Sequence, residues 1–234
     1  MRTAVLALVA ASLQAADPAS PPAYATRDLR GWTLHVRKEL TTPDQAEVTE
    51  RAVRLVGEQL DAVLRVIPAP ALAELRRIPL YFSPPYAGVP RRAEYHPGRG
   101  WLAANGRDPA MVKAVEFTNL EILDKEVRRM PLLTLHELAH GYHDRTLGFE
   151  HPGVLEAFRE AEKAGTYASV ARRDWQGKET KGVRAYALTN HREYFAETTE
   201  AFFGKNDFFP FDRKELESAD PGAAAMLRKV WGAR

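Results

Sequence analysis

The stretch LHELAH, residues 135–140, lies in an apolar run that begins at Met130. In a helix His136 and His140 face the same side, because an α-helix completes a turn every 3.6 residues. Two imidazoles one turn apart can bind one metal ion, and Glu137 can take a proton from a water bound to that ion. This pattern is typical of zinc hydrolases. The alternative is a core helix that carries two histidines by coincidence, with Glu137 solvated.

A second stretch, TNHREYFAE at residues 189–197, favours the metal-site interpretation. Asn190 is a good helix N-cap and puts Glu193 at the third helical position. Glu193 and Glu197 are then four residues apart on one face, where two carboxylates repel unless a cation compensates them. Glu193 could bind a zinc ion, and Glu197 could accept a hydrogen bond from the far nitrogen of a ligand histidine. The alternative is a capping-box Glu193 with a solvated Glu197, which the bulky residues between them disfavour.

Composition is that of an ordinary globular protein. The chain has 234 residues, 45% hydrophobic and 27% charged, and its net charge of +2 gives no argument for a nucleic-acid partner. One domain with a substantial core fits this length. There is no cysteine, which excludes thiolate ligands, a thiol nucleophile and a lipid-anchored N-terminus. Every metal ligand must therefore be His, Asp or Glu.

The N-terminus has the layout of a secretory signal peptide. Arg2 precedes a short apolar stretch that runs to residue 13, and QAADP follows at residues 14–18. We predict a signal peptide over residues 1–16, a flexible segment over 17–27, and one domain over 28–234 that is secreted or periplasmic. The apolar stretch is too short for a permanent membrane anchor. A buried N-terminal helix is the alternative, and the prolines at 21 and 22 disfavour it.

Periodicity predicts an α+β domain with a small mixed sheet, followed by active-site helices and a helical C-terminus. Alternating or β-branched residues predict strands at 32–36, 78–82 and 114–118. Apolar residues at helical spacing predict a long helix over 44–67 and shorter helical segments at 71–77, 120–129 and 154–163. Loops with short strands are expected over 83–109, a polar loop over 165–182, and two further helices that begin near Asp212 and Asp220.

The two stretches together resemble the gluzincin metallopeptidases, in which a glutamate on a second helix is the third zinc ligand. Residues 186–197, YALTNHREYFAE, more closely resemble the family related to the catalytic domain of anthrax lethal factor. In that family a tyrosine seven residues before the glutamate ligand lies over the metal, and Tyr186 stands at that spacing from Glu193. The resemblance covers residues 131–203, whereas residues 28–110 carry no matching motif.

The resemblance implies a zincin-like peptidase that hydrolyses peptide or protein substrates. His136, His140 and Glu193 would hold one Zn²⁺ per chain, with a water at the fourth position. Glu137 would be general base to that water and proton donor to the leaving amine. Tyr186 would hydrogen-bond the developing oxyanion, its alternative being a core tyrosine, and Glu197 would support a ligand histidine.

Two other functions remain open. The chain could be an exported pseudoenzyme or binding protein that keeps a structural metal, or a metal-dependent hydrolase of a non-peptide substrate such as cell-wall material. Glu137 argues against the first, because a structural site closes the fourth position and needs no carboxylate there. The choice between endo- and exopeptidase action, the substrate sequence and the oligomeric state are open at this point.

Overall fold

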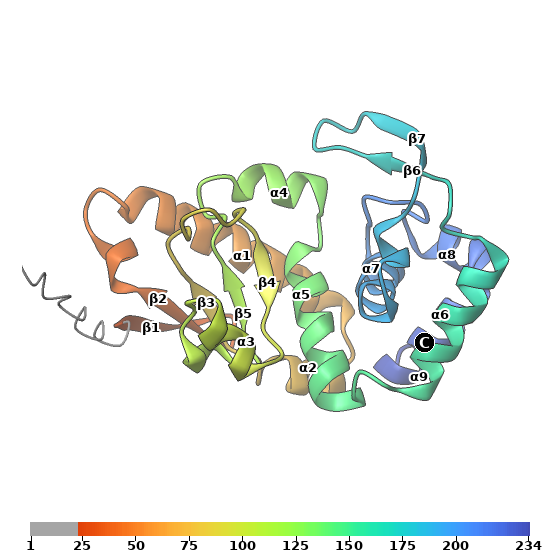
Figure 1. Ribbon diagram of the computed structural model, residues 1–234, viewed down its shortest axis with the longest axis horizontal. Coiled ribbons are helices and arrows are strands. Elements are labelled where there is room, and N and C mark those ends of the chain that lie inside the picture. Colours follow the sequence, from red (N-terminus) through yellow and green to blue (C-terminus); the bar gives the residue numbers. More distant parts are fainter. Residues whose placement is uncertain (1–22) are drawn as a thin grey trace, which may run out of the picture.

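The computed structural model describes residues 23–234, which fold as a mixed α+β structure with a small mixed sheet (Figure 1). The α+β prediction is confirmed at this level. The predicted signal peptide, residues 1–16, and residues 17–22 of the predicted flexible segment lie outside the described residues.

The prediction of a flexible segment is wrong for its last residues, because Tyr24–Leu29 forms strand β1. This strand pairs antiparallel with β2, Trp32–Arg37. Arg30 and Gly31 connect them, and both have a positive φ, 60° and 88°. Such a two-residue turn matches the right-handed twist of paired strands. The proline-rich composition just upstream suggested a linker, but pairing with β2 supplies the backbone partners that make residues 24–27 a strand.

The main sheet has five strands in the order β1-β2-β3-β5-β4. Its centre is parallel, and β1 and β4 are antiparallel strands at the two edges. The bounds of the remaining strands are Leu80–Phe82 for β3, Ala93–Tyr95 for β4 and Val115–Phe117 for β5. The predicted strands at 32–36, 78–82 and 114–118 are confirmed as β2, β3 and β5. The edge strand β4 belongs to the region where loops and short strands were expected.

Helices α1 (Ala46–Val66) and α5 (Leu133–Tyr142) pack on each other, and α5 also contacts β4 and β5. The long predicted helix is confirmed as α1, and its apolar stripe is fully buried at Ala52, Val56 and Leu60. Complete burial of a side chain such as Leu60 contributes roughly 1.5–3 kcal/mol. Shorter helices complete this half of the chain: α2 (Ala69–Leu75), α3 (Arg99–Ala104) and α4 (Leu123–Arg129).

A glycine lets α5 lie close to the sheet. A Cβ atom at Gly141 would stand 2.5 Å from Ile78 Cδ1 and 3.1 Å from Tyr95 Cε2, so a larger residue would displace both neighbours. The close approach brings α5 against the end of β4. Beyond Tyr142 a single π-helical turn, His143–Leu147, precedes Gly148 at φ 82°. The helical segment ends at this glycine.

The C-terminal half is mainly helical, with α6 (Pro152–Ala164), α7 (His191–Phe203), α8 (Arg213–Ala219) and α9 (Pro221–Trp231). Asp212 and Asp220 cap α8 and α9 as predicted. The prediction of a loop over 165–182 is wrong, because β6 (Val170–Arg173) and β7 (Glu179–Val183) form a hairpin there. Its residues are mostly polar and exposed, so no apolar alternation marked the strands. Within residues 23–234, no helix combines the length and apolar character needed to cross a membrane.

Aromatic residues hold α5 and α7 in a defined relation. The Trp231 ring is stacked on Tyr142, with centroids 4.2 Å apart, and lies parallel to Phe195 at 5.8 Å. Buried Asp220 accepts hydrogen bonds from the hydroxyls of Tyr167 and Tyr194, at 3.0 and 2.7 Å. Helix α9 therefore anchors residues of both helices, which sets the distance between the side chains that α5 and α7 present to each other.

Candidate metal centre

Helix α5 presents His136, Glu137 and His140 to a pocket of about 490 Å³. The imidazole rings of the two histidines lie edge to face, with centroids 4.8 Å apart. Their Nε2 atoms are 3.2 Å from each other. The structure therefore brings both histidines together on one face of the helix, as their spacing predicts.

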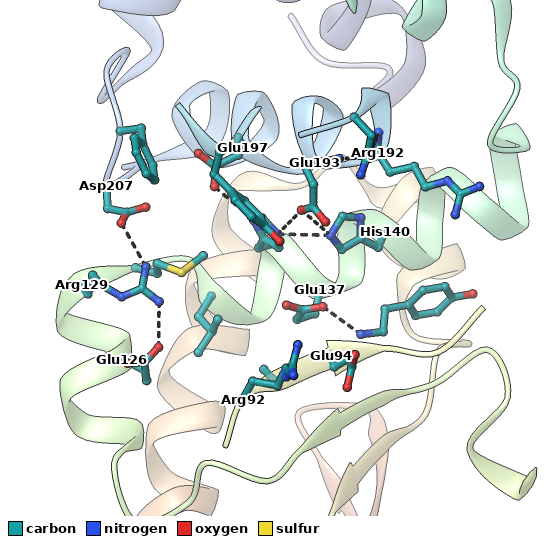
Figure 2. Close-up of a pocket in the computed structure, with 18 of the residues that line it drawn as sticks. Arg92, Glu94, Glu126, Arg129, Glu137, His140, Arg192, Glu193, Glu197 and Asp207 are labelled. Atoms are coloured by element: carbon teal, nitrogen blue, oxygen red, sulfur yellow. Dashed lines mark hydrogen bonds and ion pairs between the residues drawn. The ribbon is translucent and has the colours of Figure 1, made fainter. Parts of the chain in front are cut away.

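Helix α7 supplies Glu193 from the opposite side of this pocket (Figure 2). The side chain of Asn190 accepts hydrogen bonds from the N–H groups of Arg192 and Glu193, at 2.9 and 3.0 Å, so the N-cap prediction is confirmed. This cap fixes the first turn of α7. Glu193 Oε2 lies 3.3 Å from the Nε2 atom of His136 and 3.3 Å from that of His140.

The three atoms form a nearly equilateral triangle with sides of 3.2, 3.3 and 3.3 Å. Ligand atoms about 2.0–2.1 Å from a tetrahedral zinc ion are separated by about 3.3 Å. Glu193 Oε2 is buried yet makes no hydrogen bond, which is costly for a carboxylate oxygen without a cation. In both spacing and chemistry, His136, His140 and Glu193 can hold a metal ion.

In the metal-free site, the carboxylates around His136 favour a positive charge close to them. Burial disfavours a charged His136, but the carboxylates of Glu193 and Glu200 outweigh burial and hold the pKa of His136 well above its usual value. Burial alone would raise the pKa of Glu193, whereas the adjacent imidazoles bring it well below its usual range. A proton on His136 thus compensates the carboxylates when no metal is present. A divalent cation would take the place of that proton.

The far nitrogen of His136 is bound by a residue that sequence reasoning missed. Nδ1 of His136 lies 2.7 Å from Oε1 of Glu200. Glu197 Oε1 is 3.9 Å from the same nitrogen, and Glu197 Oε2 accepts a hydrogen bond from Asn206 at 3.1 Å. The hydrogen bond predicted for Glu197 is therefore made by Glu200. Acidic residues recur at positions 193, 197 and 200, and spacings of four and seven residues fall on one helical face. This recurrence was the sequence signal that could have identified Glu200.

Glu197 and Glu200 are completely buried beside His136, and together with its Nδ1 they form a second cluster of possible ligand atoms. Burial, and next the charge of Glu200, raise the pKa of Glu197 to about 8. Glu197 is therefore mostly protonated at neutral pH. Because the Nδ1–H group is already hydrogen-bonded to Glu200, we assign this pair to the support of His136 rather than to a second cation.

Glu137 is held by the sheet. Its Oε2 atom accepts a hydrogen bond of 2.9 Å from the backbone N–H of Tyr95, at the end of β4. Burial raises the pKa of Glu137 above its usual value. Figure 2 shows this carboxylate across from His140 and Glu193 in the same pocket. A buried carboxylate of raised pKa at this position is suited to accept a proton at neutral pH.

Tyr186 lies at the pocket and not in the core. It begins a short 3₁₀ turn, Tyr186–Leu188, lines the pocket and is 46% exposed. Partial burial of its hydroxyl, and next the charge of Glu193, raise its pKa. The alternative of a core tyrosine is therefore wrong. The hydroxyl keeps its proton at neutral pH and can donate a hydrogen bond.

The other pocket walls come from segments with no recognisable motif. One wall is the edge strand with the residues beside it, including Arg92 and Tyr95, and another contains Arg129, Arg172 and Asp207. These side chains are far apart in the sequence, so no local pattern could place them at the site.

Comparison of the chain with protein-family models, with curated proteins and with solved structures finds no match. The geometry of the pocket and the chemistry of its residues are therefore the basis for a functional inference. The strongest element of that geometry is the triangle of His136, His140 and Glu193 with Glu137 beside it.

Proposed function

We propose that this chain is a zinc-dependent metallopeptidase with a zincin-like domain of the gluzincin kind. The observation that carries the proposal is the ligand triangle of His136, His140 and Glu193, which opens into a pocket that also contains Glu137. A closed structural site would surround the ion with protein ligands on all sides. An open pocket with a buried carboxylate is what hydrolysis needs.

A bound zinc ion would supply Lewis-acid chemistry, which acidifies water and polarises a carbonyl group. Glu137 would take the proton from the attacking water and return it to the leaving amine. The backbone N–H of Tyr95 holds the carboxylate of Glu137 in place for both transfers. Tyr186 would donate its O–H to the oxygen on which negative charge develops.

A peptide substrate is favoured by the edge strand β4. The backbone groups of Arg92 and His96 are hydrogen-bonded toward β5. Because backbone directions alternate along a strand, those of Ala93 and Tyr95 point away from β5, toward the pocket that both residues line. The hydrogen bond from Tyr95 to Glu137 shows this direction. An extended peptide can pair with such an edge, as in other cases of β-strand addition.

The first test is the metal content of protein purified without added metal. We expect about one zinc per chain in the wild type and a large loss in Glu193→Ala. Glu162→Ala, which removes an exposed carboxylate from α6, is the matched control and should retain zinc. Zinc-loaded wild type should then hydrolyse members of a peptide library. No stoichiometric metal, even after zinc is offered, would overturn the proposal.

The same measurements separate the other functions. Stoichiometric zinc without hydrolysis of any peptide would favour the pseudoenzyme or binding protein. Hydrolysis of cell-wall material, but not of peptides, would favour the non-peptide hydrolase. Hydrolysis of peptides that depends on zinc and is absent from Glu193→Ala supports the peptidase.

A further inference from the structure

A chain of ion pairs crosses the pocket at one end, and we call it the Asp207 bridge. Arg129 on α4 binds Glu126 at 2.8 Å and Asp207 at 3.0 Å, and Arg172 on β6 binds the same oxygen of Asp207 at 3.1 Å. The Asp207 side chain is only 1% exposed. Figure 2 shows Asp207, Arg129 and Glu126 in a row between the two walls. All four residues line the pocket, and the bridge forms its end where α4 lies.

The β6–β7 hairpin supports the bridge. The N–H of Arg173 donates to the carbonyl of Asp207 at 2.8 Å, and that of Phe209 donates to the carbonyl of Ala171 at 2.8 Å. Trp175, in the turn of the hairpin, has its ring 5.3 Å from the guanidinium carbon of Arg128 on α4. The backbone contacts tie the hairpin to the segment of Asp207, and the contact of Trp175 ties it to α4; Figure 1 shows the hairpin extending toward α4.

The bridge stands close to the metal centre. Asn206, the neighbour of Asp207, donates to Glu197 at 3.1 Å, and Glu197 lies 3.9 Å from His136 Nδ1. Along the other wall only Met130 and Leu133 line the pocket between Arg129 and His136. A substrate that runs from the metal centre toward the bridge therefore has room for only a short segment beyond the bond to be cleaved.

The charge of Arg92, beside the edge strand β4, selects which terminus of a peptide fits. Glu126 and Asp207 are compensated by Arg129 and Arg172. Arg92 lines the same pocket, and Figure 2 shows its side chain pointing into it. Within residues 23–234, the hydrogen bonds of Arg92 involve only its backbone, through Thr118. Its guanidinium can bind a carboxylate in charge-assisted hydrogen bonds, whereas a terminal ammonium would be repelled.

We propose that this enzyme removes a short segment from the free C-terminus of peptides, and that Arg92 binds the terminal carboxylate. The inference rests on the proposed peptidase function and specifies its substrate class. In the reaction the oxygen of water adds to the carbonyl carbon and the C–N bond breaks. The shortened peptide gains a new carboxylate. The released short segment takes a proton from the water onto the nitrogen of the broken bond, so it gains a new amino group, and it keeps its original carboxylate.

Binding tests the docking site independently of turnover. The protein is zinc-loaded Glu137→Gln, and the probes are two peptides of identical sequence that end in a free acid or in an amide. We expect the acid to bind about 10- to 100-fold more tightly, the range for hydrogen bonds to charged groups. Adding Arg92→Gln to this variant should bring the ratio of the two peptide affinities near one. Adding Arg91→Gln should leave it unchanged, because the adjacent Arg91 pairs with Glu121 and does not line the pocket.

Product analysis by mass spectrometry tests the cleavage position with wild type. We expect products shortened from the C-terminus and little cleavage of the amide. Internal cuts in long peptides, or equal binding of acid and amide, would overturn the C-terminal proposal while the peptidase function stands. Acid-selective binding without hydrolysis of any peptide would support the docking site and count against the peptidase. Failure of both peptides to bind would overturn the docking site.

Discussion

His136 donates a hydrogen bond from Nδ1 to Glu200 Oε1 at 2.7 Å, and this contact orients the Nε2 atom of the same ring toward His140 and Glu193. The carboxylate holds the proton on Nδ1 and leaves Nε2 free to bind a cation. Glu200 is thus expected to matter for metal binding although it lies outside the ligand triangle.

The first prediction concerns this contact. Glu200→Gln should weaken zinc affinity about 10- to 100-fold, because outer partners of ligand histidines contribute that much. Competition with a chelator measures the affinity. Glu197→Gln is the matched control, since Glu197 is bound by Asn206 and lies farther from Nδ1. An equal loss in both variants would mean that Glu200 has no specific role.

The second prediction concerns Glu137. Glu137→Gln should retain zinc and lose turnover by about 10²- to 10⁴-fold, the usual contribution of general acid–base catalysis. The amide can still accept the N–H of Tyr95, so the fold should be kept. Zinc content and rate are measured on the same preparation, with Glu162→Gln as a surface control. Undiminished hydrolysis would contradict the role assigned to Glu137.

The third prediction concerns Tyr186. Tyr186→Phe should lower kcat by about 10²- to 10³-fold with little change in KM, since the hydroxyl would act only on charge that develops in the transition state. Because the side chain is 46% exposed, the thermal midpoint should shift little. A raised KM with unchanged kcat would assign the tyrosine to substrate binding instead.

The fourth prediction is a pH dependence of the metal-free protein. The pKa of Glu197 is 4.5 for an unperturbed side chain and about 8 in the fold. Between these values Glu197 is protonated in the folded protein and ionised in the unfolded chain, so its contribution to the free energy of unfolding falls as pH rises. The stabilisation of the fold by Glu197 is complete below about pH 4.5 and is lost as pH rises through about 8. In this range its contribution to the free energy of unfolding falls by at most about 1.4 kcal/mol per pH unit.

Urea unfolding at several pH values in the presence of a chelator measures this slope. Glu197→Gln should flatten it, because the amide does not titrate. His136, whose pKa is also raised, contributes in the same direction, so some slope should remain. Equal slopes in metal-free wild type and Glu197→Gln would refute the assignment.

Local sequence determined the helices that carry the site. The 3.6-residue period placed His136 and His140 on one face of α5, and the cap at Asn190 set where α7 begins. Both effects act within one or two turns of a helix, so they can be derived without knowledge of the rest of the fold. The expected ligand set of His136, His140 and Glu193 followed from these two stretches and their resemblance to a known family.

Tertiary structure alone decided how these elements meet. Whether Glu197 or Glu200 reaches Nδ1 of His136 depends on how α7 packs against α5, which α9 controls through Trp231. The position of β4 at the sheet edge decides that the backbone of Tyr95 holds Glu137. The Asp207 bridge joins side chains 78 and 35 residues apart. Such contacts depend on the packing of distant segments, for which periodicity and capping carry no information.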